Sequence, residues 1–141
     1  MKDLALHDFP SHATDKIRYS DTDRQGHVNN AVFVTFLETG RVNIIYHPDY
    51  PILPQGASFV IASVQLNFIR EIKWPGEVAI GTGITKLGNS SVRLVQHIFQ
   101  NDQCVATSES VIVQVDDNTS RSLPLTAEAR AILGKWAMDL S

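Results

Sequence analysis

The chain has 141 residues, of which 43% are hydrophobic and 19% are charged, enough apolar material for the core of a single domain over residues 1–141. A net charge of −3 at pH 7 argues against the basic surface with which proteins bind nucleic acid, so no nucleic-acid partner is expected. Charge or proline interrupts every early apolar stretch, and no later run approaches the roughly 18 apolar residues of a membrane span. We therefore expect a cytoplasmic protein without a signal peptide or membrane contact.

The first predicted elements are a short strand and a helix. Alternation of apolar and polar residues predicts a strand over residues 14–19. After a polar loop, apolar side chains in residues 31–46 cover nearly every direction of a helical projection, which predicts a helix that is buried all round. Asn29 or Asn30 is expected to cap its first turn, and Pro48 ends the helix after about four turns.

Four later stretches alternate with period two and are separated by short turns, which predicts an antiparallel meander. In the first stretch, the even-numbered residues from Val60 to Phe68 are expected to share one face. A final amphipathic pattern after a possible cap at Thr126 predicts a helix over about residues 126–140. The four strands are predicted at residues 58–70, 77–87, 90–100 and 103–115.

An apolar helix and one antiparallel sheet have one sensible arrangement, in which long strands curl around the helix. We therefore expect an α+β fold, with a long central helix wrapped by a five-stranded antiparallel sheet and followed by the C-terminal helix. Such a sheet leaves an open edge and an outer face that need covering. This predicts a homo-oligomer, with a dimer as the minimum and a tetramer favoured.

Residues 21–30 gather two carboxylates, an imidazole, a glycine and two asparagines directly before the predicted helix. The first N–H groups of a helix lack intrahelical acceptors and carry partial positive charge, so they can receive an oxyanion. A carboxylate held opposite them would complete a hydrolytic pair. Thioesters suit such a pair because a thiol of pKa about 8.5 leaves with little acid assistance.

The same residue types also form turns and helix caps, which leaves a structural reading open. Asp21 is the better candidate for a turn or cap, whereas Asp23 lies too far upstream to cap a helix that starts near Asn30. His27 alone is more often a hydrogen-bonded structural histidine. Gly26 can serve simply to permit a positive φ.

The string DTDRQGHVNN, followed by Phe33 and by Glu38-x-x-Arg41, resembles the 4-hydroxybenzoyl-CoA thioesterase-like family of acyl-CoA thioesterases. The resemblance extends over roughly residues 14–116. It implies the hotdog fold and the hydrolysis of acyl-CoA thioesters to free acid and coenzyme A, in a site between two subunits.

The resemblance also implies roles for five residues of the first loop. Asp23 matches the family's essential carboxylate, which acts as general base or nucleophile toward the thioester. Asn30 matches the position whose backbone N–H polarises the thioester carbonyl. His27, Val28 and Asn29 line the turn beside it.

The sequence differs from the motifs of two related groups of enzymes, and these differences narrow the expected activity. Plant acyl-carrier-protein thioesterases share the HVNN string but have Asn where this chain has Gln25, which favours coenzyme A as the carrier. Hydratases of the same fold carry Asp-x-Asn-Pro-x-His, whereas Asp23 and His27 are four residues apart with no proline between them. Two alternative functions stay open. A hotdog hydratase or dehydratase is the weaker enzymatic one, and a noncatalytic acyl-CoA-binding module is the non-enzymatic one.

Other polar residues have weaker claims to the site. Glu38 and Arg41 can pair with each other or at a subunit contact, and Glu38 can also position the site. Arg70 can meet the phosphates of coenzyme A, and Ser91 follows a glycine turn in a region often near the family's ligand site.

Cys104, the only cysteine, excludes an internal disulfide and is expected to be a small buried residue. Motifs for serine hydrolases, phosphate loops, dinucleotides and metals are missing from the sequence, so neither a cofactor nor a metal is expected.

Overall fold

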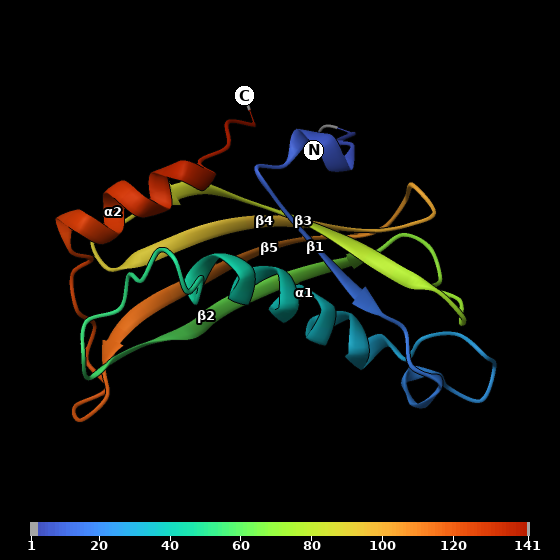
Figure 1. The fold of residues 1–141 in the computed structure, drawn as a ribbon. Coiled ribbons are helices and arrows are strands. Elements are labelled where there is room, and N and C mark those ends of the chain that lie inside the picture. Colours follow the sequence, from blue (N-terminus) through green and yellow to red (C-terminus); the bar gives the residue numbers. More distant parts are fainter. Residues whose placement is uncertain (1–2, 141) are drawn as a thin grey trace.

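The computed structural model describes residues 3–140. Its sheet has five antiparallel strands in the order β1-β3-β4-β5-β2, so β1 and β2 form the two edges (Figure 1). The four strands predicted after the helix are confirmed within two residues at each end. The strands are β1 (Ser11–Lys16), β2 (Ala57–Phe68), β3 (Glu77–Leu87), β4 (Ser91–Gln100) and β5 (Gln103–Asp116).

The predicted meander is confirmed for β3, β4 and β5 and is wrong for β2. Strand β2 pairs with β5 over almost its whole length, and β1 takes the place beside β3. Strands β2 and β3 are not neighbours in the sheet because the connection between them does not form a hairpin turn. Its residues are bound instead to the loop before the helix, where the N–H of Val28 donates to the carbonyl of Ile72 at 2.9 Å.

The first strand is displaced from its prediction by three residues. β1 runs from Ser11, opposite Thr82, to Lys16, opposite Glu77, rather than over residues 14–19. Beyond Lys16 the chain leaves β3 and forms a short 3-10 helix, η2 (Tyr19–Asp21), in which Tyr19 is 73% exposed. The pairing partner therefore decides where this strand lies, and the local alternation does not.

Helix α1 (Asn30–Ile45) lies across one face of the sheet (Figure 1). Asn29 is confirmed as its cap, since the side-chain Oδ1 accepts a hydrogen bond from the N–H of Ala31 at 3.0 Å. The prediction that this helix is buried all round is wrong, because Val34 and Val42 are 42% and 43% exposed. The long central helix wrapped by the sheet is thus found only in part, as a helix of 16 residues packed on one side. The side that faces the sheet is formed by Phe33, Phe36, Leu37, Gly40, Arg41, Ile44 and Ile45.

A β-bulge in β2 changes which side chains face the helix. The register with β5 shifts between Ile61 and Ser63, so one extra residue enters the strand there. Before the shift Phe59 packs against the core under the end of α1, and after it Leu66 does so under the beginning. The prediction that Val60 shares a face with Phe68 is therefore wrong, because the bulge reverses the alternation between them.

Both ends of the described part of the chain, residues 3–140, lie on the side of the sheet away from α1 (Figure 1). The predicted C-terminal helix is shorter than residues 126–140. It consists of α2 (Ala127–Leu133), capped by Thr126 as expected, and a 3-10 turn, η3 (Gly134–Trp136). The tail that follows pairs with β3 through a bridge between Ala137 and Ile84, and so covers the edge of β3 that β1 does not reach.

Within residues 3–140, no helix combines the length and the apolar character needed to cross a membrane.

Candidate functional site

The loop between η2 and α1 is a tight turn held by its own backbone. Thr22 and Val28 form an isolated bridge, and inside it the N–H of Asp23 donates to the carbonyl of His27 at 2.8 Å. The N–H of Gly26 donates to the carbonyl of Asp23 at 3.1 Å, and Gly26 has a φ of +84°. A side chain at that position would be strained, so the predicted need for glycine is confirmed.

A second set of contacts fixes this turn against the segment that follows β2. His27 forms a bridge with Lys73, and its Nε2 lies 3.1 Å from the Oε2 of Glu71. Val28 is buried at 3% exposure in the same apolar cluster as Ile72. His27 therefore has the hydrogen-bonded structural role that the sequence left open for it, and Val28 anchors the turn to the core.

The carboxylate of Asp23 also takes part in the turn. Its Oδ1 accepts hydrogen bonds from the N–H groups of Gln25 at 2.8 Å and His27 at 3.3 Å. Its Oδ2 takes part in neither bond, and the residue is exposed. Asp23 thus combines a structural bond at one oxygen with a second oxygen that is available to a ligand.

Asp23 and the start of α1 line one hollow of about 400 Å³, here called the Asp23 hollow. It brings together four of the predicted site residues of the loop and helix start, together with Arg70 from the segment after β2. Phe68, Ile69 and Glu71 also line it and were not predicted as site residues, although they fall within the stretch of the resemblance, residues 14–116. The lining residues are Asp23, Gln25, His27, Val28, Asn30, Phe33, Phe68, Ile69, Arg70 and Glu71.

In the first turn of α1, one residue that lines this hollow has an unpaired backbone donor within residues 3–140. The N–H of Ala31 is bonded to the cap, and the N–H of Val32 donates to the carbonyl of Asn29 at 2.9 Å. The N–H of Asn30 has no acceptor within residues 3–140, as expected for the first residue of a helix. Asn29 uses its side chain for the cap and does not line the hollow.

Two predicted supporting residues lie elsewhere in the chain. Glu38 lines a second hollow farther along α1, together with Arg41. Ser91 begins β4, whereas Gln100 at the other end of β4 accepts a hydrogen bond from the N–H of Lys73 at 3.0 Å. A strand rises about 3.3 Å per residue, so Ser91 lies about 30 Å from that end of the sheet. A single chain does not bring Glu38 or Ser91 to the Asp23 hollow.

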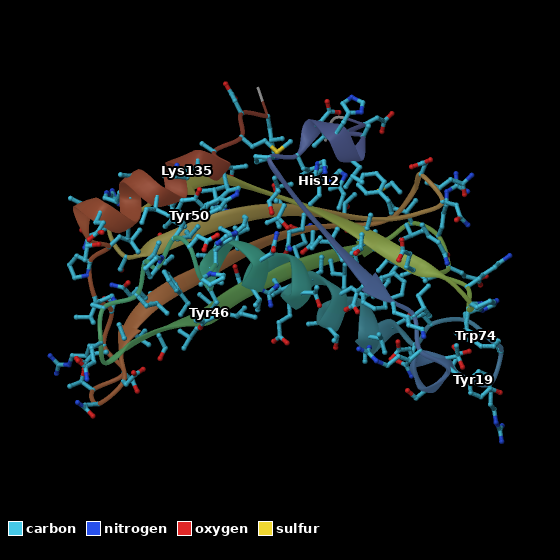
Figure 2. The ribbon with its side chains drawn as sticks, in the orientation of Figure 1. His12, Tyr19, Tyr46, Tyr50, Trp74 and Lys135 are labelled. Carbon is cyan, nitrogen blue, oxygen red and sulfur yellow. The ribbon has the colours of Figure 1, made fainter. Side chains whose placement is uncertain are left out.

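An aromatic pair stands beside the loop. The rings of Tyr19 and Trp74 meet edge to face with centroids 5.2 Å apart, and Figure 2 shows both at the end of the molecule where the loop lies. Both side chains are exposed. They flank the candidate site but do not line the Asp23 hollow.

The single cysteine lies on the other face of the sheet from α1. Cys104 is half-buried, and its Sγ lies 4.0 Å from the Nδ1 of His97, a contact that was not predicted from the sequence. Burial raises the pKa of the Cys104 thiol and lowers the pKa of the His97 imidazole, so both groups favour their neutral forms. A neutral thiol is a poor nucleophile, and this pair is therefore a weak candidate for catalysis.

In the part of the chain that the structure describes, no three His, Cys, Asp or Glu side chains are grouped so as to hold a metal ion.

Comparison with known proteins places these features in a family. A family model described as Thioesterase-like superfamily matches residues 17–133. The acyl-CoA thioester hydrolase YbgC of Escherichia coli O6:H1 is 23% identical over 120 residues, which cover 83% of this chain and 85% of YbgC. A protein from Bacillus stearothermophilus, described as a predicted thioesterase, has a similar structure with a TM-score of 0.82 and 26% identity, covering 93% of this chain and 98% of that one.

A further similar structure is that of a thioesterase from Thermus thermophilus, solved in complex with coenzyme A and Zn. It is 29% identical with a TM-score of 0.78, and the match covers 89% of this chain and 98% of the Thermus chain.

Proposed function

We propose that this chain, which belongs to the Thioesterase-like superfamily and is a thioesterase, hydrolyses acyl-CoA thioesters to a free acid and coenzyme A. The observation that carries the proposal is the Asp23 hollow, which holds an exposed carboxylate beside the unpaired N–H of a helix start. The name of YbgC and the coenzyme A bound to the Thermus thioesterase favour coenzyme A over a carrier protein.

In the proposed reaction, the carbonyl oxygen of the thioester accepts a hydrogen bond from the N–H of Asn30. Asp23 removes a proton from a water molecule whose oxygen attacks the carbonyl carbon. The oxyanion that forms is stabilised by the donor and the positive end of α1. When the carbon–sulfur bond breaks, the thiolate of coenzyme A recovers the proton from Asp23. A direct attack by the Asp23 carboxylate, followed by hydrolysis of the anhydride, uses the same two groups.

The remaining residues of the hollow support this reaction in three ways. The bonds from Gln25 and His27 to Oδ1 of Asp23 fix the carboxylate in place. Phe33 and Phe68 meet edge to face at 5.0 Å and provide an apolar surface for the acyl group. Arg70 offers a cation for the phosphates of coenzyme A. The reaction consumes only water and thioester, so we propose that it uses no cofactor or metal.

We also propose that two copies of the chain pair through β2. This strand is a sheet edge of 12 residues, and its side chains Val60, Ile61, Val64 and Phe68 are between 39% and 51% exposed. An unpaired apolar edge of this length associates readily, and an isologous contact between two copies would satisfy it. Replacing Ile61 with Lys should shift sedimentation at micromolar concentration toward the monomer. A wild-type protein that sediments as a monomer would contradict the proposal.

The activity is tested by mixing the purified protein with a panel of acyl-CoA thioesters and following release of the free thiol. We expect turnover with at least one member of the panel. Binding of acyl-CoA without thiol release would instead favour the noncatalytic module. Loss of enoyl absorbance without thiol release would favour the hydratase.

A further inference from the structure

Arg41 is a buried cation, and one nitrogen of its guanidinium has no hydrogen-bond acceptor in the described part of the chain. Its side chain is 6% exposed, and its Nη1 has no hydrogen-bond acceptor within residues 3–140. Arg41 forms none of the ion pairs found there. Burial lowers its pKa, and the charge of Glu38 offsets this only in part. A guanidinium removed from water without an acceptor is costly, so something that the chain itself does not supply is expected to meet it.

Arg41 lines a hollow of about 210 Å³ between α1, β2 and β5, here called the Arg41 hollow. Figure 2 shows Tyr46, another of its lining residues, near the C-terminal end of α1. This volume exceeds the roughly 150 Å³ of an apolar cavity that takes up benzene. Its other walls are mostly apolar and are formed by Glu38, Val42, Ile45, Phe59, Ile61 and Ile112.

The Arg41 hollow and the Asp23 hollow lie along the same helix and strand. Asn30 and Arg41 are 11 residues apart on α1, which is a rise of about 16 Å. Val34, Glu38 and Val42 follow one another at intervals of four residues and form a stripe along the helix between the two hollows. Val34 and Val42 leave more than a third of their surface exposed, so an acyl chain that runs along the helix can contact apolar side chains on both sides of Glu38.

We propose that the Arg41 hollow binds a carboxylate at the far end of the acyl group, so that the protein favours thioesters of dicarboxylic acids. The inference rests on the proposed function, since it names the substrate class of the same site. A carboxylate is the acceptor that best matches a guanidinium, because it takes two parallel charge-assisted hydrogen bonds. The mostly apolar walls of the hollow lower the local dielectric constant and strengthen such a pair.

The test compares thioesters of dicarboxylic acids with methyl-ended thioesters of the same chain length, in a series of increasing length. For wild type we expect kcat/KM to favour the carboxylate by about 10- to 10²-fold once the chain reaches Arg41, as for one charge-assisted hydrogen bond. Arg41→Met should abolish this preference and leave the methyl-ended substrates little changed. Arg41→Lys should retain part of it, and Arg121→Met, at an exposed arginine, should retain all of it.

Stability separates recognition from a structural role. Replacing an unpaired buried charge with an apolar side chain of similar size is expected to leave Tm unchanged or to raise it. Free dicarboxylic acids should raise the Tm of wild type and of Arg121→Met, but not that of Arg41→Met. A lower Tm or a dissociated oligomer in Arg41→Met would show that Arg41 meets a protein group, and would overturn the inference.

Two kinetic outcomes have different meanings. If wild type hydrolyses the thioesters without preferring the carboxylate at any length, the inference about Arg41 is wrong and the proposed function stands. If wild type hydrolyses none of them, the proposed function fails. The Tm measurements with free dicarboxylic acids then decide alone whether Arg41 binds a carboxylate.

Discussion

Gly40 lies where α1 approaches the sheet closely, so Gly40→Ala is a sharp test of the packing. A Cβ at this position would lie 2.7 Å from the Nε2 of Gln96, 2.7 Å from the Cγ2 of Ile80 and 2.8 Å from the Oγ1 of Thr82. All three residues are at most 1% exposed, so none can move into solvent. The Nε2 of Gln96 also donates to the carbonyl of Leu37 at 2.9 Å.

Two opposing effects determine how much Gly40→Ala changes the free energy of unfolding. Alanine favours a helix over glycine by about 1 kcal/mol. Overpacking costs about 1–3 kcal/mol, and displacing Gln96 from its buried hydrogen bonds costs a further 1–3 kcal/mol or so. The free energy of unfolding of Gly40→Ala should therefore fall by roughly 1–5 kcal/mol, against the helix propensity of alanine.

Urea unfolding followed by circular dichroism measures this difference. Gly134→Ala is the matched control, because a Cβ at Gly134 meets nothing within 4 Å and the residue already has right-handed helical dihedral angles. The control should be neutral or slightly stabilising. A Gly40→Ala protein as stable as wild type would refute the close approach of α1 to β3 and β4.

Two further predictions concern His97 and Asn29. Burial lowers the pKa of His97 below its ordinary 6.5, so the unfolded chain binds this proton more readily and stability falls as pH drops below about 6.5. His97→Gln should reduce the loss of Tm between pH 7.5 and pH 5.5, and an unchanged loss would contradict the burial effect. Asn29→Ala should lower the free energy of unfolding by about 1 kcal/mol through loss of the cap, whereas Asn29→Asp keeps the acceptor and should retain most of the stability. Equal stability of the two Asn29 variants in urea would exclude the capping role.

The sheet was predictable where pairing is local. Strands β3, β4 and β5 follow one another through short turns, so alternation and turn residues were sufficient to locate them. The position of β1 and the neighbour of β2 depend on residues far away in the sequence, and alternation carries no information about them. The bulge in β2 is likewise invisible in the pattern, because an inserted residue changes the face without changing the composition.

The helices show a similar division. Asn29 and Thr126 were recognisable as caps because a cap acts on the next three residues. The end of α2 was not predictable, since the tail after η3 leaves helical geometry to pair with Ile84 at the edge of β3. The exposure of Val34 and Val42 was missed because helix periodicity cannot tell how many sides of a helix its own chain covers.

The candidate site was predictable in its local part. Asp23, His27 and Asn30 are close in sequence, and a tight turn before a helix necessarily gathers them. Glu71 joins the site through a contact with His27 that links positions more than forty residues apart, and no local signal marks it. The buried state of Arg41 is also a tertiary property, because nothing in the sequence shows that the Nη1 of an arginine within a helix is buried without an acceptor.

The central claim, that Asp23 carries the hydrolysis, is tested most directly by the kcat of Asp23→Asn in the thiol-release assay. Asparagine keeps an oxygen for the N–H groups of Gln25 and His27, so the turn should persist and Tm should change little. Our account predicts that kcat falls on the order of 10² or more, whereas Asp21→Asn retains most of the wild-type turnover. A fully folded Asp23→Asn protein with wild-type kcat would contradict it.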